Sequence, residues 1–202
     1  MLSRSPRRER GVTLIEILIA FVLLGFLITL SLPSFAAWIS NAKVRTVAES
    51  LQQGVRTAQA EAVRRNRQVV LFFTNQTPAG VGPAAIAGGR NWSVQTVQQF
   101  GAADAQFVQG GALTDVASDV TIASETATPV TALCFNSMGR LVVNANPGPS
   151  GGSCAAASAD LRVASTSSDR PLRVLVGVAG QVRLCDPKRP TLSESSPDGC
   201  PP

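Results

Sequence analysis

Residues 11–32 read GVTLIEILIAFVLLGFLITLSL, and this stretch decides how the chain is built. It contains a single charged side chain, Glu16. A helix of about 20 apolar residues covers the hydrocarbon core of a bilayer, so the run predicts a membrane-spanning helix. A charge in hydrocarbon costs roughly 2.5–3.5 kcal/mol and usually carries function. Glu16 is therefore predicted to be functional; the alternative is an ordinary anchor with one tolerated polar residue.

The segment before this run is basic. It sets one acid, Glu9, against four arginines: Arg4, Arg7, Arg8 and Arg10. Only Lys43 and Arg45 follow shortly after the run. Basic residues stay on the cytoplasmic side of a membrane, so we expect a cytoplasmic N-terminus and an outer C-terminal part. No small-x-small cleavage site follows the apolar run, as a secretory signal peptide would require. Any processing is therefore expected before it.

The sequence Gly11-Val12-Thr13-Leu14-Ile15-Glu16 resembles the cleavage and methylation motif of type IV pilins and type II secretion pseudopilins. That motif is a glycine, an aromatic or apolar residue, and then T-L-I-E. The resemblance implies that a prepilin peptidase cuts after Gly11 on the cytoplasmic side and that Val12 becomes a methylated N-terminus. Phenylalanine is commonest at the position of Val12. Glu16 would be the fifth residue of the mature chain.

In this family the acid corresponding to Glu16 pairs with the N-terminal amine of a neighbouring subunit during assembly. An α-amino group, with a reference pKa of about 7.7–8.0, is largely cationic at neutral pH and can compensate a buried carboxylate. The resemblance therefore implies other pilin or pseudopilin subunits as partners. It also implies a single-pass protein of the bacterial inner membrane with a periplasmic C-terminal domain, which later joins an extracytoplasmic filament.

The net charge of the whole chain is +5. Without residues 1–11 the chain keeps 14 basic and 12 acidic side chains, a net charge of +2. The high isoelectric point is thus mostly a property of the leader and does not indicate nucleic-acid binding over the whole surface. The roughly 165 residues beyond the anchor can bury one modest core, so we expect one globular domain.

Helical periodicity continues beyond the apolar run. Apolar residues recur here at steps of three and four, which predicts one face of an amphipathic helix. This stripe consists of Val44, Ala48, Leu51, Val55, Ala58 and Ala62. Pro33 is expected to kink or interrupt the helix. The other faces carry Lys43, Arg45, Glu49, Arg56, Glu61, Arg64, Arg65 and Arg67. A solvated face with cations near the helix C-terminus is favoured for these charges over a polyanion contact.

Strand patterns follow the helix. The candidate strands are residues 68–73, 92–97, 119–123, 131–135, 140–143, 161–164, 172–178 and 181–185. Residues 92–97 alternate like a half-buried strand, and 136–139 and 179–180 are candidate hairpin turns. Residues 76–91 and 144–159 are expected to be surface loops. We therefore predict an α+β fold, with a long N-terminal helix packed on an antiparallel β-sheet domain. The expected parts are a leader 1–11, an assembly helix 12–38, an amphipathic helix 39–67 and a β-rich domain 68–202.

Four cysteines, Cys134, Cys154, Cys185 and Cys200, lie on the expected extracytoplasmic side, where disulfides form. Three pairings are possible. We favour Cys134 with Cys154 and Cys185 with Cys200, because each pair closes a loop within one hairpin or tail. The second bond would attach the tail 187–202 to the last strand. A zinc site is disfavoured because the chain has no C-x-x-C pair, and no metal is expected.

The helix text LQQGVRTAQAEAVRRN at 51–66, followed by QVVLFF, is similar to the GspH/FimT minor pilins and pseudopilins. Their helix reads L-x-x-A-x-x-x-A-R-x-E-A-x-R-R, and Gln59 stands where arginine or serine is usual. The strand pair 131–143 and the ending GQVRLCDP at 180–187 are also similar. The resemblance implies the type IV pilin fold and a minor pilin that helps to prime or cap a pilus. A type II secretion minor pseudopilin is the alternative.

Some FimT-like members bind DNA in natural transformation through a C-terminal G-R-x-R motif. Here Gly180-Gln181-Val182-Arg183 lacks the first arginine. A small cationic patch is a candidate DNA contact, since DNA affinity grows with phosphate contacts; its residues would be Arg173, Arg183, Lys188 and Arg189. Asp186 and Glu194 dilute it, and aromatic stacking partners are absent nearby. Double-stranded DNA is thus a further candidate partner.

An enzyme is the least favoured function. The chain has no histidine, the usual general base near neutral pH and the commonest metal ligand. The stretch Gly148-Pro-Ser-Gly-Gly152 has the spacing G-x-S-x-G but is better explained as a loop, and no phosphate-binding glycine loop stands out. We therefore expect neither catalytic residues nor a cofactor.

Overall fold

The computed structural model describes residues 11–77, 80–98, 105–113 and 117–201. The arginines and the acid of the leader, residues 4–10, lie outside the described residues. One helix, α1 (Leu14–Arg65), runs from the N-terminal motif to the first strand. It begins after the N-cap residue Thr13 and ends at Asn66, whose backbone is left-handed with φ 50° and ψ 39°. The two predicted helical segments thus form one helix.

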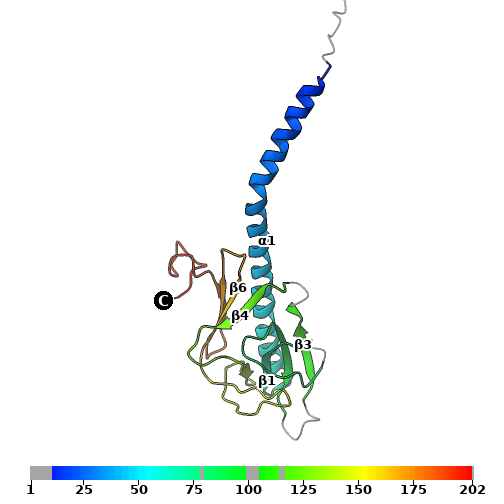
Figure 1. Ribbon diagram of the computed structural model, residues 1–202. Coiled ribbons are helices and arrows are strands. Elements are labelled where there is room, and N and C mark those ends of the chain that lie inside the picture. Colours follow the sequence, from blue (N-terminus) through cyan, green and yellow to red (C-terminus); the bar gives the residue numbers. More distant parts are fainter. Residues whose placement is uncertain (1–10, 78–79, 99–104, 114–116, 202) are drawn as a thin grey trace, which may run out of the picture.

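Pro33 was expected to kink or interrupt the helix, and α1 is continuous through Pro33, so the helix is not interrupted. The helix bends within its blue half instead, as Figure 1 shows. A proline inside a helix removes one backbone hydrogen bond and crowds the preceding turn, and a bend accommodates both effects without ending the helix.

In the part of the chain that the structure describes, eight strands form two antiparallel sheets, where the sequence indicated one. The first sheet has the order β3-β2-β1-β5, built from β1 (Val69–Thr74), β2 (Asn91–Thr96), β3 (Phe107–Gly111) and β5 (Ala132–Phe135). The second has the order β4-β6-β7-β8, built from β4 (Val120–Ser124), β6 (Ala159–Ser165), β7 (Leu172–Val176) and β8 (Val182–Cys185). Seven of these strands overlap the predicted ones.

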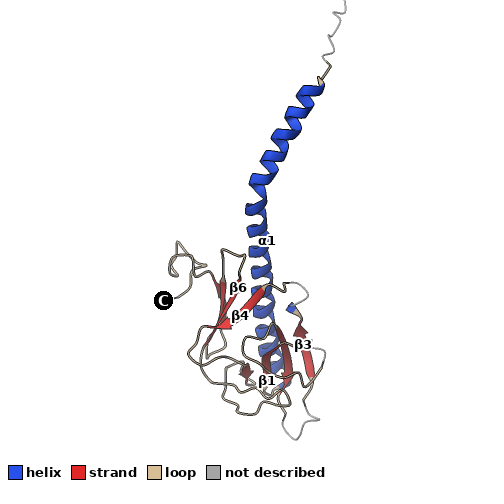
Figure 2. Ribbon diagram, in the orientation of Figure 1, coloured by secondary structure: helices blue, strands red, loops and turns tan. Residues whose placement is uncertain are grey.

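The apolar stripe of α1 lies at the centre of the core. All six predicted positions, from Val44 to Ala62, are fully buried. α1 contacts strands of both sheets. Figure 2 shows the strands gathered around the lower half of the helix, while the upper half stands clear of them. A long helix packed on antiparallel sheets, the predicted α+β fold, is therefore confirmed.

β2 is buried along its entire length, so the prediction of a half-buried strand is wrong. One face packs toward α1, where Trp92 lies against Gly54. The other face is covered by a loop: Gln95 Nε2 donates to Ser150 Oγ at 3.0 Å, and Ser150 O accepts from Ala85 N. The alternating pattern carried no information about this covering loop.

β3 was not predicted, because its sequence FVQGG shows little alternation. Its final glycine has a packing role. A Cβ added to Gly111 would lie 2.4 Å from Trp92 Nε1, so only glycine lets the strand approach the indole.

The predicted strand 140–143 forms only a single bridge, between Phe135 and Leu141. Leu141 N donates to Val178 O of the other sheet's turn, whereas Val142 N donates to Cys134 O. The segment divides its hydrogen bonds between the two sheets and so cannot extend one ladder.

Gln59 ties the two predicted turns to α1. Its side-chain amide donates to Gly139 O, at 3.3 Å, and to Gly180 O. Gly180 has a φ of 95°, and an added Cβ would lie 2.2 Å from Gly139 O. The turns of the two sheets thus meet on one helical side chain.

The two favoured disulfides are present. Cys134 is bonded to Cys154 and Cys185 to Cys200. The first lies in a small apolar cluster with Val70 and Phe72, on the face of the first sheet away from the main core. The second joins the end of β8 to the C-terminal tail.

Candidate functional site

The N-terminal motif forms an exposed chain segment that leads into a capped helix. Gly11 and Val12 precede α1 and are exposed. Thr13 is extended, with φ −82° and ψ 150°, and its Oγ1 accepts a hydrogen bond from Glu16 N at 3.3 Å. The peptide bond between Gly11 and Val12 therefore lies outside the helix, in an exposed segment of the kind that proteases reach most easily.

Glu16 lies in the first turn of α1 and is exposed. A carboxylate there is favoured by the positive end of the helix dipole. Thr13 is a site residue that the sequence analysis missed. The spacing Thr13-x-x-Glu16 is the sequence pattern of a capping box and was the available signal.

The described side chains in the first half of α1 are not covered by the rest of the protein. The large apolar side chains described between Leu14 and Ile28 are all exposed, and burial begins only at Ser40. The helix is long and apolar enough to cross a membrane, with a mean hydropathy of 2.6 in its most apolar window. Figure 1 shows this half projecting away from the domain. A surface this apolar requires a bilayer or other apolar helices around it.

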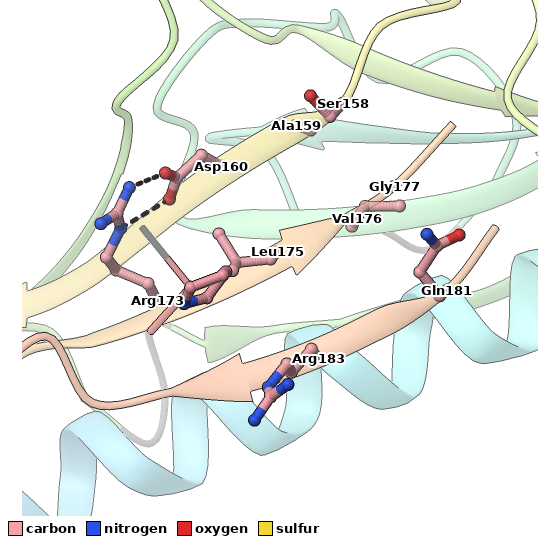
Figure 3. Close-up of a pocket in the computed structure, with 10 residues that line it drawn as sticks. Ser158, Ala159, Asp160, Arg173, Leu175, Val176, Gly177, Gln181 and Arg183 are labelled. Atoms are coloured by element: carbon pink, nitrogen blue, oxygen red, sulfur yellow. Dashed lines mark hydrogen bonds and ion pairs between the residues drawn. The ribbon is translucent and has the colours of Figure 1, made fainter. Parts of the chain in front are cut away.

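Arg173 and Arg183, two of the predicted DNA contacts, line one pocket of about 410 Å³. The guanidinium of Arg173 donates two hydrogen bonds to the carboxylate of Asp160 on β6, and Figure 3 shows it turned toward that acid. Arg183 Nη2 donates to Pro197 O at 2.6 Å. Gln181 lines the same pocket, so the position of the missing arginine faces it too.

The other two predicted contacts lie elsewhere. Arg189 lines a second pocket and its Nε lies 3.3 Å from Asp198 Oδ2. Lys188 is exposed in the tail. The structure therefore divides the four predicted cations, and two of them are ion-paired.

The cations at the end of α1 have partners within the protein. Glu61 accepts from Arg64 Nη2 at 2.6 Å and from Arg65 Nε at 2.7 Å. Hydrogen bonds from Arg64 and then Arg65 lower the pKa of Glu61 to about 2. Arg67 Nη2 donates to Val97 O at 2.6 Å. These arginines at the end of α1 are therefore bonded to groups of the same protein.

A polar cluster joins α1 to the second sheet. Lys43 Nζ lies 3.1 Å from Asp119 Oδ1, and Ser165 Oγ donates to Asp119 Oδ2 at 2.8 Å. The hydrogen bond from Ser165, followed by that from Lys43, lowers the pKa of Asp119. Within the described part of the chain, no three His, Cys, Asp or Glu side chains come together as a metal site.

Comparison with known proteins gives two matches to family models. The model described as type II transport protein GspH matches residues 47–180, and the model of the prokaryotic N-terminal methylation motif matches residues 6–32. Among curated proteins, no relative matches this chain.

Two kinds of solved structure are similar to this chain. The type IV minor pilin FimU of Pseudomonas aeruginosa is 18% identical, with a TM-score of 0.49, over 81% of this chain and 98% of FimU. The minor pseudopilin EpsH from the type 2 secretion system of Vibrio cholerae is 15% identical, with a TM-score of 0.47, over 73% of this chain and 99% of EpsH.

Proposed function

Since this chain belongs to the GspH family and carries the N-terminal methylation motif, we propose that it is a minor type IV pilin. In this proposal it is a structural subunit that is incorporated into a pilus and helps to prime or cap it. The observation that carries the proposal is the apolar first half of α1, which projects from the domain with its side chains uncovered. Such a helix can lie in a membrane and later pack among the same helices of other subunits.

Maturation is the first step of the proposed function. A prepilin peptidase cuts between Gly11 and Val12 on the cytoplasmic side of the inner membrane, and Val12 is methylated. The exposure of these two residues, which precede the helix, supports this step. The basic leader supports the orientation, with the disulfide-bonded domain on the periplasmic side.

Assembly is the second step. The new amine at Val12 carries a positive charge, and Glu16 of a neighbouring subunit supplies the matching carboxylate. The exposure of Glu16 on the first turn of the helix supports its availability to a neighbour. A carboxylate left unpaired among apolar helices would carry a large desolvation cost, which favours subunits in the paired register.

The second candidate is a minor pseudopilin of a type II secretion system. The observation in its favour is the matched family model, which is described as a type II transport protein. Maturation and Glu16 pairing would be the same, and only the filament would differ.

Double-stranded DNA receives less support as a partner. Gln181 replaces the first arginine of the motif, and Arg173 is already bound to Asp160. A cation held by an internal carboxylate contributes less to phosphate binding, because that pair must first be broken.

The proposed assembly step is tested with Glu16→Gln, which keeps the size of the side chain and removes its charge. Thr29→Val is the matched control, since Thr29 is a polar side chain on the same helix, bonded to Phe26 O. We expect Glu16→Gln to be inserted and processed normally, but recovered at least about tenfold less in sheared filaments, because the partner amine loses its counter-charge.

Thr29→Val should be recovered like the unmodified chain. Normal recovery of Glu16→Gln would overturn the assembly mechanism. Recovery of the chain with pilus or with pseudopilus subunits separates the two candidate filaments.

A further inference from the structure

A pocket of about 560 Å³ lies beside α1, just beyond its apolar half. Its wall includes Trp38 and Arg45 of α1, Arg170 before β7, and Arg189 of the tail. We propose that this pocket binds the phosphate of an anionic phospholipid in the leaflet that faces the domain, while the subunit resides in the membrane. The proposal rests on the proposed function only in requiring the membrane anchor.

The position of the pocket matches the headgroup layer. Trp38 is 64% exposed and lies next to the exposed Phe35, with ring centroids 5.8 Å apart. Exposed aromatic residues at the end of a membrane helix mark the interface. Arg45 is seven residues beyond Trp38, about 10 Å along a helix. The interfacial layer on each side of a bilayer is roughly 5–8 Å thick, so Arg45 lies at its outer edge when Trp38 lies at its inner edge.

Arg189 belongs to the C-terminal tail, which contributes one wall of the pocket. Figure 1 shows the red C-terminal tail at the end of the domain from which the helix projects. The bond between Cys185 and Cys200 holds this tail, as does the hydrogen bond from Asp186 N to Asp198 O at 2.8 Å. The pocket wall is thus held in place before a ligand arrives.

Asn41 positions Arg170, the third arginine of the pocket. Its side-chain amide donates to Asp169 Oδ1, and its Oδ1 accepts from Arg170 N at 3.1 Å. These two bonds hold the turn between β6 and β7 against α1. Arg170 is thereby brought to the rim of the pocket from a position 129 residues away in the sequence.

The charge of the pocket suits a phosphate. Three arginines and two acids, Asp186 and Asp198, line the pocket. Arg45 Nε is also paired with Glu49 Oε1 at 2.8 Å, and both of these side chains are more than half exposed. Asp186 accepts from Lys188 N at 2.8 Å, and the pair of Arg189 with Asp198 is half exposed on both sides. Exposed ion pairs are weak, whereas a guanidinium binds phosphate through two parallel hydrogen bonds. A phosphate can therefore replace Asp198 as the partner of Arg189.

The apolar part of the wall favours a lipid over a free phosphate ion. Trp38, Ala42, Leu172 and Leu184 line the same pocket as the arginines. Glycerol and the first acyl carbons of a phospholipid would contact these side chains while the phosphate contacts the guanidinium groups.

The test uses the full-length chain in dodecyl maltoside micelles, titrated with phosphatidylglycerol, phosphatidylcholine or soluble glycerol 3-phosphate. Trp38 fluorescence reports binding, because the other tryptophan, Trp92, is only 2% exposed. We expect saturable binding of one phosphatidylglycerol per chain, with phosphatidylcholine and glycerol 3-phosphate binding more weakly.

Charge removal identifies the site. Arg170→Gln with Arg189→Gln should weaken phosphatidylglycerol binding by about fivefold per arginine. Arg140→Gln, an exposed arginine in the turn after β5, is the matched control and should bind normally. Arg45→Gln is a second test that does not depend on the fold, because the Arg45 side chain is 73% exposed.

Equal binding of the two lipids, or unchanged binding by both the double variant and Arg45→Gln, would overturn the proposal. So would glycerol 3-phosphate binding as tightly as the lipid. A chain that alkaline carbonate removes from membranes would instead contradict the anchor on which the proposed function depends.

Discussion

Glu61 shows how much of this protein's charge is used internally. One carboxylate accepts hydrogen bonds from arginines three and four residues later, and its side chain is only 17% exposed. These bonds lower the pKa of Glu61 from 4.5 to about 2. The folded state therefore favours the ionised acid. This contribution to stability is complete above pH 4.5 and is lost as the pH falls toward 2.

Glu61→Gln should lower the free energy of unfolding by about 1 kcal/mol at pH 7, a figure reduced for the solvent exposure of Arg64. The deficit relative to the unmodified chain should shrink between pH 4.5 and 2, because the unmodified carboxyl becomes protonated there. Thermal unfolding of both proteins at a series of pH values measures this difference in stability. Glu49→Gln, which removes a more exposed pair with Arg45, should have a smaller effect. A deficit that stays constant down to pH 2 would contradict this interpretation.

At the residue scale, the sequence predicted the bonding partner of a side chain only where few residues of the right chemical type were available. Four cysteines allow only three pairings, and the favoured pairs are the observed ones. The partner of Arg173 was not predictable in this way. Asp160 reaches it only because β6 and β7 pair in a particular register.

Among the elements, α1 was the most predictable. Its buried stripe follows directly from the spacing of apolar residues, since every third or fourth side chain lies on one face. The conformations of β3 and of the segment 140–143 were not predicted correctly. In both, the backbone conformation depends on contacts with distant residues: Trp92 for Gly111, and Val178 for Leu141.

The C-terminal tail should depend on its disulfide. Replacing Cys185 and Cys200 by alanine should lower the free energy of unfolding by about 3 kcal/mol, because the bond closes a loop of 15 residues. Trypsin should then cut after the exposed Lys188 much faster than in the unmodified chain.

The control is a variant in which Cys134 and Cys154 are both replaced by alanine. It should destabilise the domain by a similar amount while the tail stays resistant, since that bond lies in a separate apolar cluster. Mass spectrometry measures the rate of cleavage after Lys188 in the unmodified chain and in both double variants. Equal rates in all three proteins would show that the bond between Cys185 and Cys200 does not order the tail.

At the scale of the whole molecule, α1 is the element that both sheets share. Each of the described strands pairs within its own sheet, and strands of both sheets pack on the helix. Gln59 and the cluster of Lys43, Asp119 and Ser165 add polar links between helix and sheets. We therefore expect damage to the buried face of α1 to affect the two sheets together.

Leu51→Ala should lower the free energy of unfolding by about 2–5 kcal/mol, because Leu51 is fully buried and the truncation leaves a cavity. Hydrogen exchange should show both β1 and β7 losing protection to the same extent. Val63→Ala, at an exposed position on the same helix, should change stability by less than about 0.5 kcal/mol. Loss of protection in one sheet alone would show that the sheets are stable independently of α1.

The sequence by itself determined the properties that depend on spacing along the chain: the apolar run, the amphipathic stripe, the N-terminal motif and most of the strands. These follow because helix and strand periods place side chains at fixed intervals. Only the tertiary structure decided that the strands form two sheets, that β2 is covered on both faces, and that Arg45, Arg170 and Arg189 share a pocket. Those outcomes depend on which distant segments pack together, and packing is decided by the complementary shape and hydrogen bonding of the whole core.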